Sequence, residues 1–150
     1  MISRYEMLSG VTTEISRLIS KISAAEMKRY GLRGSWARYL LLLKKHEGRI
    51  TATRLSALSM RNKADVSRSL AELEEQGLLE RTSSAYRARL ILTPRGREIA
   101  DALYNRAMEI IETAGRGISD EDRKILYTSL EKLSKNLGEI CKELGRAGTE

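Results

Sequence analysis

Two long apolar stripes, one near each end of the chain, constrain the fold more than any other feature of the sequence. Residues 1–30 repeat apolar side chains at the spacing of one helix face without a proline, and a second such series follows Ser119. The two series are Val11, Ile15, Leu18, Ile19, Ile22 and Met27, and then Ile125, Leu126, Leu130, Leu133, Leu137, Ile140 and Leu144. A single helix cannot bury such a stripe alone. We therefore expect the terminal helices to pack together and against those of a second copy in an isologous two-fold interface, the alternative being a purely intramolecular bundle.

Between the stripes, the sequence predicts a series of short elements. They are helices at 36–46, 52–58 and 62–76, strands at 78–79 and 87–92, and a helix that starts at Thr93-Pro94 and ends near 115–117. Ser35 and Thr51 are the expected caps of the first two helices, and Ile50 suits a hydrophobic staple before the second. Two helices across a tight turn, followed directly by a β-hairpin, predict a helix-turn-helix with a wing.

Positive charge is concentrated in the same middle part of the chain. Residues 28–97 hold 16 Lys and Arg against 6 Asp and Glu, a net charge of +10, whereas the whole chain carries +7. Such a concentration is typical of a surface that binds a polyanion, because each neutralised phosphate releases condensed counterions. A basic surface that is merely solvated is the alternative.

These features together predict a mainly α fold with a small β-hairpin wing, that is, a winged helix-turn-helix with N- and C-terminal dimerisation helices. We expect residues 1–30 to form an N-terminal dimerisation helix, 31–97 the DNA-binding domain, and 98–150 the C-terminal dimerisation helices.

The sequence gives little support to an enzyme, a metal protein or a membrane protein. His46 is the only histidine, so a metal cluster built from several histidines is excluded and a Ser-His-Asp site would depend on this one residue. Cys141 is the only cysteine, so no internal disulfide can form. No glycine-rich phosphate loop occurs. The longest aliphatic run, 39–43, is far shorter than the roughly 20 residues that cross a bilayer, and no secretory leader is visible. We expect a cytoplasmic protein that is not an enzyme and that needs no cofactor or metal.

Two segments resemble the MarR/SlyA family of winged helix-turn-helix regulators. The segment from Asn62 to Arg81, NKADVSRSLAELEEQGLLER, is similar to the family's recognition helix and first wing strand, and RLILTPRG, from Arg89 to Gly96, is similar to its second wing strand with the Leu-Thr-x-x-Gly that follows. The resemblance implies a homodimer that binds a pseudo-palindromic operator in double-stranded DNA and represses transcription.

The sequence departs from the family pattern at two places. Ser84 and Tyr86 occupy the positions where the family often has an Asp-x-Arg at the wing tip, so the wing arginine cannot be transferred by motif. Arg87 and Arg89 are the nearby candidates. The turn of the helix-turn-helix has Ser59-Met60-Arg61 in place of the small glycine common there, which leaves its geometry open.

The predicted DNA-binding residues lie on the outer face of the third helix, at its approach and in the wing. Arginine can pair with guanine, asparagine with adenine, aspartate with the cytosine amino group and alanine with the thymine methyl. The residues expected to face base edges are Asn62, Lys63, Ala64, Asp65, Ser67 and Arg68. Those expected near phosphate are Thr51, Thr53, Arg54 and Arg61, with Lys63 again, and Arg87 and Arg89 are expected in the wing.

Many MarR-like proteins release DNA when a small aromatic or phenolic anion binds between the DNA-binding and dimerisation parts. The residues that could line such a cleft here are Tyr30, Trp36, Arg38 and Tyr39. The aromatic residues among them could equally fill the core. A non-specific architectural nucleic-acid-binding protein and a protein-interaction bundle are the functional alternatives.

Overall fold

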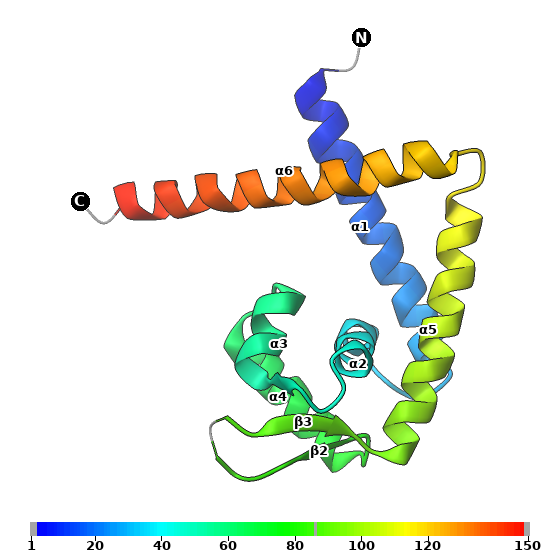
Figure 1. The fold of residues 1–150 in the computed structure, drawn as a ribbon, viewed down its shortest axis with the longest axis vertical. Helices are drawn as coiled ribbons and strands as arrows, with labels where there is room; N and C mark the ends of the chain where they lie inside the picture. The colour runs from blue at the N-terminus through cyan, green and yellow to red at the C-terminus, as the bar shows by residue number, and fades with distance from the viewer. Residues whose placement is uncertain (1–2, 86, 149–150) are drawn as a thin grey trace. The chain divides into compact units, whose positions relative to one another are not determined.

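The computed structural model describes residues 3–85 and 87–148, and the chain forms two compact units, 1–107 and 108–150. Its elements are α1 (Arg4–Lys28), α2 (Trp36–Lys45), β1 (Ile50–Thr51), α3 (Ala52–Ser59), α4 (Lys63–Glu75), β2 (Leu79–Arg81), β3 (Arg89–Leu92), α5 (Pro94–Ala114) and α6 (Asp120–Ala147) (Figure 1). The predicted fold class is confirmed: the described chain is mainly helical with a small antiparallel sheet, and α3, α4 and the β2–β3 hairpin form a winged helix-turn-helix.

The core of the first unit lies between α2, α3, α4 and the sheet. Trp36, Tyr39, Leu40 and Leu43 form the buried face of α2, and each is at most 1% exposed. The opposing side chains from α4 are Val66, Leu70 and Leu73, whose helical spacing puts them on one face. Because this core fixes α4 against α2 and α3, the opposite face of α4 has a defined orientation.

The sheet has three strands in the order β1-β3-β2, one more than the sequence predicted. Ile50 pairs with Leu90, so it is a 1% exposed strand residue rather than only a helix staple. The second wing strand begins at Arg89, two residues later than predicted, because Arg87 lies in a turn. Ala88, Leu90 and Leu92 are buried, because alternate residues point to the same face.

The wing is joined to the start of α5 at one compact junction. The Thr93 hydroxyl donates to the carbonyl oxygen of Gly77 at 2.6 Å and accepts from the backbone N–H of Gly96 at 3.1 Å. The backbone N–H of Thr93 donates to the carbonyl oxygen of Leu78 at 3.1 Å. The two sequence segments that carry the family resemblance therefore meet in space: the Gly-Leu turn lies against the Thr-x-x-Gly helix start.

Side-chain caps define most helix starts. Thr51 accepts from the backbone N–H of Arg54 before α3, as predicted, and Ser119, the hydroxyl residue just before the second apolar series, accepts from that of Asp122 before α6. The expected Ser35 cap is wrong. Residues 33–35 already form a turn, in which the N–H groups of Trp36 and Ala37 donate to backbone carbonyls, so the Ser35 hydroxyl has no cap bond in α2.

The apolar stripes of α1 and α6 remain exposed within the described chain. Met27 is the buried residue of α1, and α6 has none. Leu133 and Leu137 in α6 are 39% and 49% exposed.

In the second unit, Arg123 of α6 contacts the end of α5 by donating to Glu112 at 3.0 Å and to the carbonyl oxygen of Gly115 at 3.1 Å. Among the described residues, no helix is both long and apolar enough to cross a membrane.

Candidate nucleic-acid interface

The first turn of α4 presents most of the predicted base-facing residues. Asn62 caps this helix by accepting from the backbone N–H of Asp65 at 2.7 Å, so the chain changes direction just before α4. Over the cap and the first two turns of α4, the exposed residues are Asn62, Lys63, Ala64, Ser67 and Arg68, and Asp65 is half-buried. Because Val66 and Leu70 are buried on the other side, the exposed face is a polar edge of a fixed helix, which is what entry into a major groove requires.

A left-handed residue forms the turn between α3 and α4. Met60 has φ 56°, a conformation that glycine adopts without steric strain, and its side chain is 74% exposed. The Ser56 hydroxyl donates to the carbonyl oxygen of Arg61 at 2.7 Å, and that of Ser59 donates to the carbonyl oxygen of Ser56 at 3.3 Å. These bonds keep the turn tight in the absence of the glycine that the family pattern has there.

A buried phenol on α2 contacts α4 from behind. The Tyr39 hydroxyl donates to Asp65 Oδ2 at 2.7 Å, although 26 positions separate the two residues. Burial, together with the hydrogen bond to the Asp65 carboxylate and the charge of that carboxylate, raises the pKa of Tyr39 to about 12. The nearby positive charge of Arg61 and a hydrogen bond with Ser69 act in the opposite direction on this pKa. The phenol therefore stays protonated as a donor to Asp65.

Three of the predicted phosphate-contacting residues occupy the start of α3 and the adjoining strand, whereas Arg61 is exposed between α3 and α4 and Lys63 begins α4. Thr53 and Arg54 are exposed in the first turn of α3, and Thr51 is half-buried at its cap. Thr51 pairs with Arg89 across the β1–β3 ladder. The short first strand thus brings a predicted phosphate contact next to a predicted wing residue, a proximity that the sequence alone did not indicate.

The wing places Arg87 and Arg89 in exposed positions after its tip. Arg89 is tied to the opposite side of the hairpin, because its backbone N–H donates to the Thr82 hydroxyl at 3.0 Å and its carbonyl oxygen accepts from the Thr82 N–H at 3.0 Å. Ser84 is exposed near the tip, and Tyr86 lies outside the described residues.

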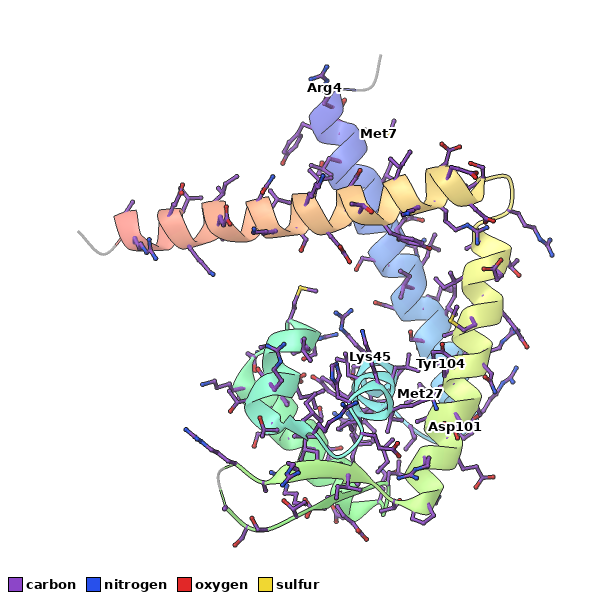
Figure 2. The ribbon with its side chains drawn as sticks, in the orientation of Figure 1. Arg4, Met7, Met27, Lys45, Asp101 and Tyr104 are labelled. Atoms are coloured by element: carbon purple, nitrogen blue, oxygen red, sulfur yellow. The ribbon has the colours of Figure 1, made fainter. Side chains whose placement is uncertain are left out.

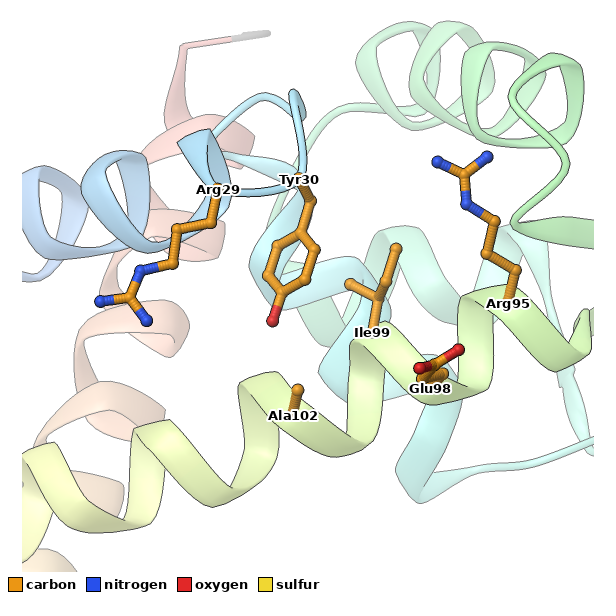
Figure 3. Close-up of a pocket in the computed structure, with 6 residues that line it drawn as sticks. All are labelled: Arg29, Tyr30, Arg95, Glu98, Ile99 and Ala102. Carbon is orange, nitrogen blue, oxygen red and sulfur yellow. The ribbon is translucent and has the colours of Figure 1, made fainter.

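The four residues predicted for an effector cleft lie in different surroundings. Trp36 and Tyr39 are 1% exposed in the core, and exposed Arg38 donates to the carbonyl oxygen of Leu58 at 3.3 Å, at the end of α3. Tyr30, by contrast, is half-buried beside an open pocket of about 420 Å³. This pocket is lined by Arg29, Tyr30, Arg95, Glu98, Ile99 and Ala102, with Arg29 and Arg95 on opposite sides of the Tyr30 ring (Figure 3).

Ionic contacts connect α2 to the first half of α5. Lys44 forms an ion pair with Asp101 and lies 5.6 Å from the ring centre of Tyr104. Figure 2 shows Asp101 and Tyr104 on α5, with Met27 of α1 nearby.

The described residues contain no cluster of histidine, cysteine, aspartate or glutamate that could hold a metal ion.

The model of the MarR family matches residues 30–90, a segment that holds α2, α3, α4 and most of the sheet. This segment is therefore similar to the MarR family.

Solved structures of MarR-family regulators and of MepR share its fold. A MarR transcriptional regulator from Methanosarcina mazei Go1 matches with a TM-score of 0.80 at 21% identity, over 92% of this chain and 94% of that one. The MepR–DNA complex from S. aureus matches with a TM-score of 0.79 at 22% identity, over 90% and 99%. A putative regulator from Listeria monocytogenes, solved with a 26mer DNA, matches with a TM-score of 0.79 at 21% identity, over 85% and 87%. No curated protein sequence matches.

Within this fold, the structure brings together some predicted residues and separates others. Six of them lie between Asn62 and the second turn of α4, five exposed and Asp65 half-buried, and the β1–β3 ladder pairs Thr51 with Arg89. Sequence reasoning did not find the contact of Tyr39 with Asp65. The available signal was a tyrosine on the apolar face of α2, whose hydroxyl would need a polar partner once buried.

Proposed function

We propose that this protein is a transcriptional repressor of the MarR family that binds a pseudo-palindromic operator in double-stranded DNA as a homodimer. The observation that carries the proposal is the start of α4. It holds Lys63 and Arg68 exposed beside Asn62 on a helix whose other face is buried, within a segment of net charge +10. Arginine and asparagine read base edges by bidentate pairing, and lysine neutralises phosphate. Two of the solved structures with this fold contain DNA.

Helix α4 and the wing contribute differently to binding in this proposal. Arg68, near the outer face of α4, pairs with a guanine edge and so distinguishes one sequence from another, whereas Arg87 contacts the minor groove or backbone and contributes mainly charge. Thr51, Thr53, Arg54, Arg61 and Lys63 hold phosphates on either side of α4, and Arg89 supports the wing. Asn62, Ala64, Asp65 and Ser67 complete the base-facing surface.

The experiment compares Arg68→Ala with Arg87→Ala on an operator selected from genomic fragments and on random duplex, at several salt concentrations. Arg68→Ala should lose about 1–3 kcal/mol of discrimination per contact, twice in a dimer. Arg87→Ala should weaken both duplexes evenly and lower the salt slope by about one unit for each phosphate that is no longer neutralised. Equal weakening of both duplexes by Arg68→Ala would show that α4 does not read bases, as in a non-specific architectural protein.

The homodimer is supported by the exposed stripes of α1 and α6. Ile19 of α1 is 55% exposed, and α6 buries none of its apolar residues within one chain. Contiguous apolar surface of this kind marks an interface in soluble proteins. An isologous dimer places two copies of α4 on one face, as two half-sites of a palindrome require. The cytoplasm is the expected location, and the proposal assigns the protein no catalytic activity.

A small aromatic or phenolic anion is proposed as the effector that releases DNA. The pocket beside Tyr30 supports this, because an aromatic ring and two arginine side chains line it. Guanidinium groups bind carboxylates and phenolates well, and the ring offers a stacking face. Benzoate should therefore weaken operator binding of the wild type, and Tyr30→Ala should reduce that effect while leaving DNA binding without benzoate unchanged. If benzoate weakens operator binding of the wild type no more than an inert salt at the same ionic strength does, this effector class is wrong.

A further inference from the structure

Asp65 differs from the other base-facing residues of α4 because a second helix holds its carboxylate. Its Oδ2 accepts from the Tyr39 hydroxyl at 2.7 Å, and its backbone N–H donates to Asn62 Oδ1 at 2.7 Å. Asp65 is half-buried, whereas Asn62 is exposed. The side chain and the backbone of this residue are therefore fixed from two directions.

The contact with Tyr39 is well suited to hold a side chain in place. The phenol ring is 1% exposed and packed in the core, so its hydroxyl has a fixed position. A buried hydroxyl requires a polar partner, and a hydrogen bond to a carboxylate is stronger than one to a neutral group. Ser69, one turn further along α4, is also buried, at 6% exposed. The hydrogen bond to Asp65 thus attaches the start of α4 to the core at the Tyr39 hydroxyl.

The arrangement leaves part of the carboxylate available for DNA. A carboxylate has two oxygens, each with two lone pairs, and Tyr39 uses one lone pair of Oδ2. Oδ1 can accept from a donor on a base edge, which in the major groove means the amino group of cytosine or adenine. If the carboxylate could rotate away from the base edge, binding a duplex with a different base at that position would cost less free energy. Fixing the carboxylate therefore increases discrimination more than it increases overall affinity.

We propose that Tyr39 is a positioning residue for sequence discrimination, whose buried phenol holds the Asp65 carboxylate so that its free oxygen selects an amino group on the base edge. This inference rests on the proposed function, since it assigns a role within the same DNA-reading surface. Tyr39 acts through Asp65 and does not contact the DNA.

A double-mutant cycle tests this dependence. The variants are Tyr39→Phe, which keeps the ring and removes the hydroxyl, Asp65→Ala, and the two combined. Tyr104→Phe on α5 is the matched control for the same chemical change elsewhere. The quantity measured is the ratio of the dissociation constants for random duplex and for the operator selected by the wild type, at constant salt and with melting temperatures recorded for each variant.

We expect Tyr39→Phe to reduce this ratio by about tenfold, which is about 1.4 kcal/mol. Asp65→Ala should reduce it at least as much, and Tyr39→Phe should have no further effect in the Asp65→Ala background. A purely structural role would lower the melting temperature without changing the ratio. The inference is overturned if Tyr39→Phe leaves the ratio at the wild-type value, or if its effect persists when Asp65 is alanine.

Hydrogen exchange in the free protein separates this inference from the proposed function. The backbone N–H groups of Asp65 and Val66 should exchange faster in Tyr39→Phe than in the wild type or in Tyr104→Phe, because the start of α4 loses its attachment to α2. A wild type that does not distinguish operator from random duplex would refute the proposed function and, with it, the role in discrimination. Unchanged exchange in Tyr39→Phe would overturn the positioning itself, whatever the DNA result.

Discussion

Gly96 is the position at which adding a single methyl group should disturb the fold most. A Cβ atom built there would lie 2.9 Å from the carbonyl carbon of Leu78 and closer still to its oxygen. Both are backbone atoms, so no side-chain rotation can relieve the overlap. Gly96→Ala must therefore separate the start of α5 from the chain at the end of α4.

The expected loss in stability follows from what this separation breaks. Overpacking of a filled site costs about 1–3 kcal/mol, and loss of the Thr93 cap on the Gly96 N–H about 1 kcal/mol. The preference of alanine over glycine within a helix offsets at most about 1 kcal/mol of this. We expect the free energy of unfolding to fall by about 2–3 kcal/mol, and the melting temperature by about 4–12 °C for a chain of this size.

The assay is thermal and urea unfolding at one protein concentration, since the stability of a dimer depends on concentration. Gly138→Ala is the control: Gly138 is a helical residue of α6, no atom lies within 4 Å of the position its Cβ would take, and it lies on the polar side next to Lys142. This variant should be as stable as the wild type or up to about 1 kcal/mol more stable. A Gly96→Ala protein that unfolds like the wild type would refute the close approach of Gly96 to Leu78.

Three further predictions concern the turn, the dimer and alkaline stability. Met60→Gly should raise the free energy of unfolding by about 0.5–1 kcal/mol, because relief of the left-handed strain exceeds the entropy that glycine adds to the unfolded chain; lower stability in urea would contradict this. The double variant Leu133→Glu, Leu137→Glu should sediment as monomers or aggregates, whereas Lys135→Glu, on the opposite side of α6, should sediment as the wild type does. A wild type that is itself monomeric at micromolar concentration would contradict this prediction. Because burial raises the pKa of Tyr39 to about 12 from about 10 in an unfolded chain, its protonated form is favoured in the folded state. The contribution of Tyr39 to the free energy of unfolding is therefore complete below about pH 10 and decreases between pH 10 and 12. Over this range, the free energy of unfolding should fall less steeply with pH in Tyr39→Phe than in the wild type. Equal slopes in the two proteins would show that Tyr39 titrates normally.

The parts of the fold that the sequence predicted correctly are those determined by neighbours along the chain. The caps at Thr51 and Ser119 each join residues three apart, so a hydroxyl before an apolar period was enough to find them. The Asn62 cap was not predicted, because the sequence pattern placed this residue inside the helix that it caps. The Ser35 cap failed although its residue type is favourable, because the turn before α2 already supplies backbone partners for the first N–H groups. Local pattern indicates where a cap is possible but not whether it is needed.

The features that the sequence did not predict depend on contacts between distant segments. Strand β1 has only two residues, and it exists because Ile50 pairs with Leu90, 40 positions away. The role of Tyr39 likewise depends on α2 lying across α4, which no period in the sequence specifies. For the proposed DNA-reading surface, the sequence pattern therefore predicted which face of α4 is exposed, whereas only tertiary packing revealed the contact between Tyr39 and Asp65.

The exposed stripe of α6 makes the folded state of this protein depend on how much of it is present. With no residue of this helix buried in a single chain, a newly made copy has little to protect its last helix until it meets another. Under the proposed dimer, chains below the dissociation constant would be open to proteases and to aggregation. A cell that produces very little of the protein would then lose a larger fraction of it to degradation and aggregation. Dimerisation would in this way set a minimum level of synthesis, below which the protein could not regulate transcription.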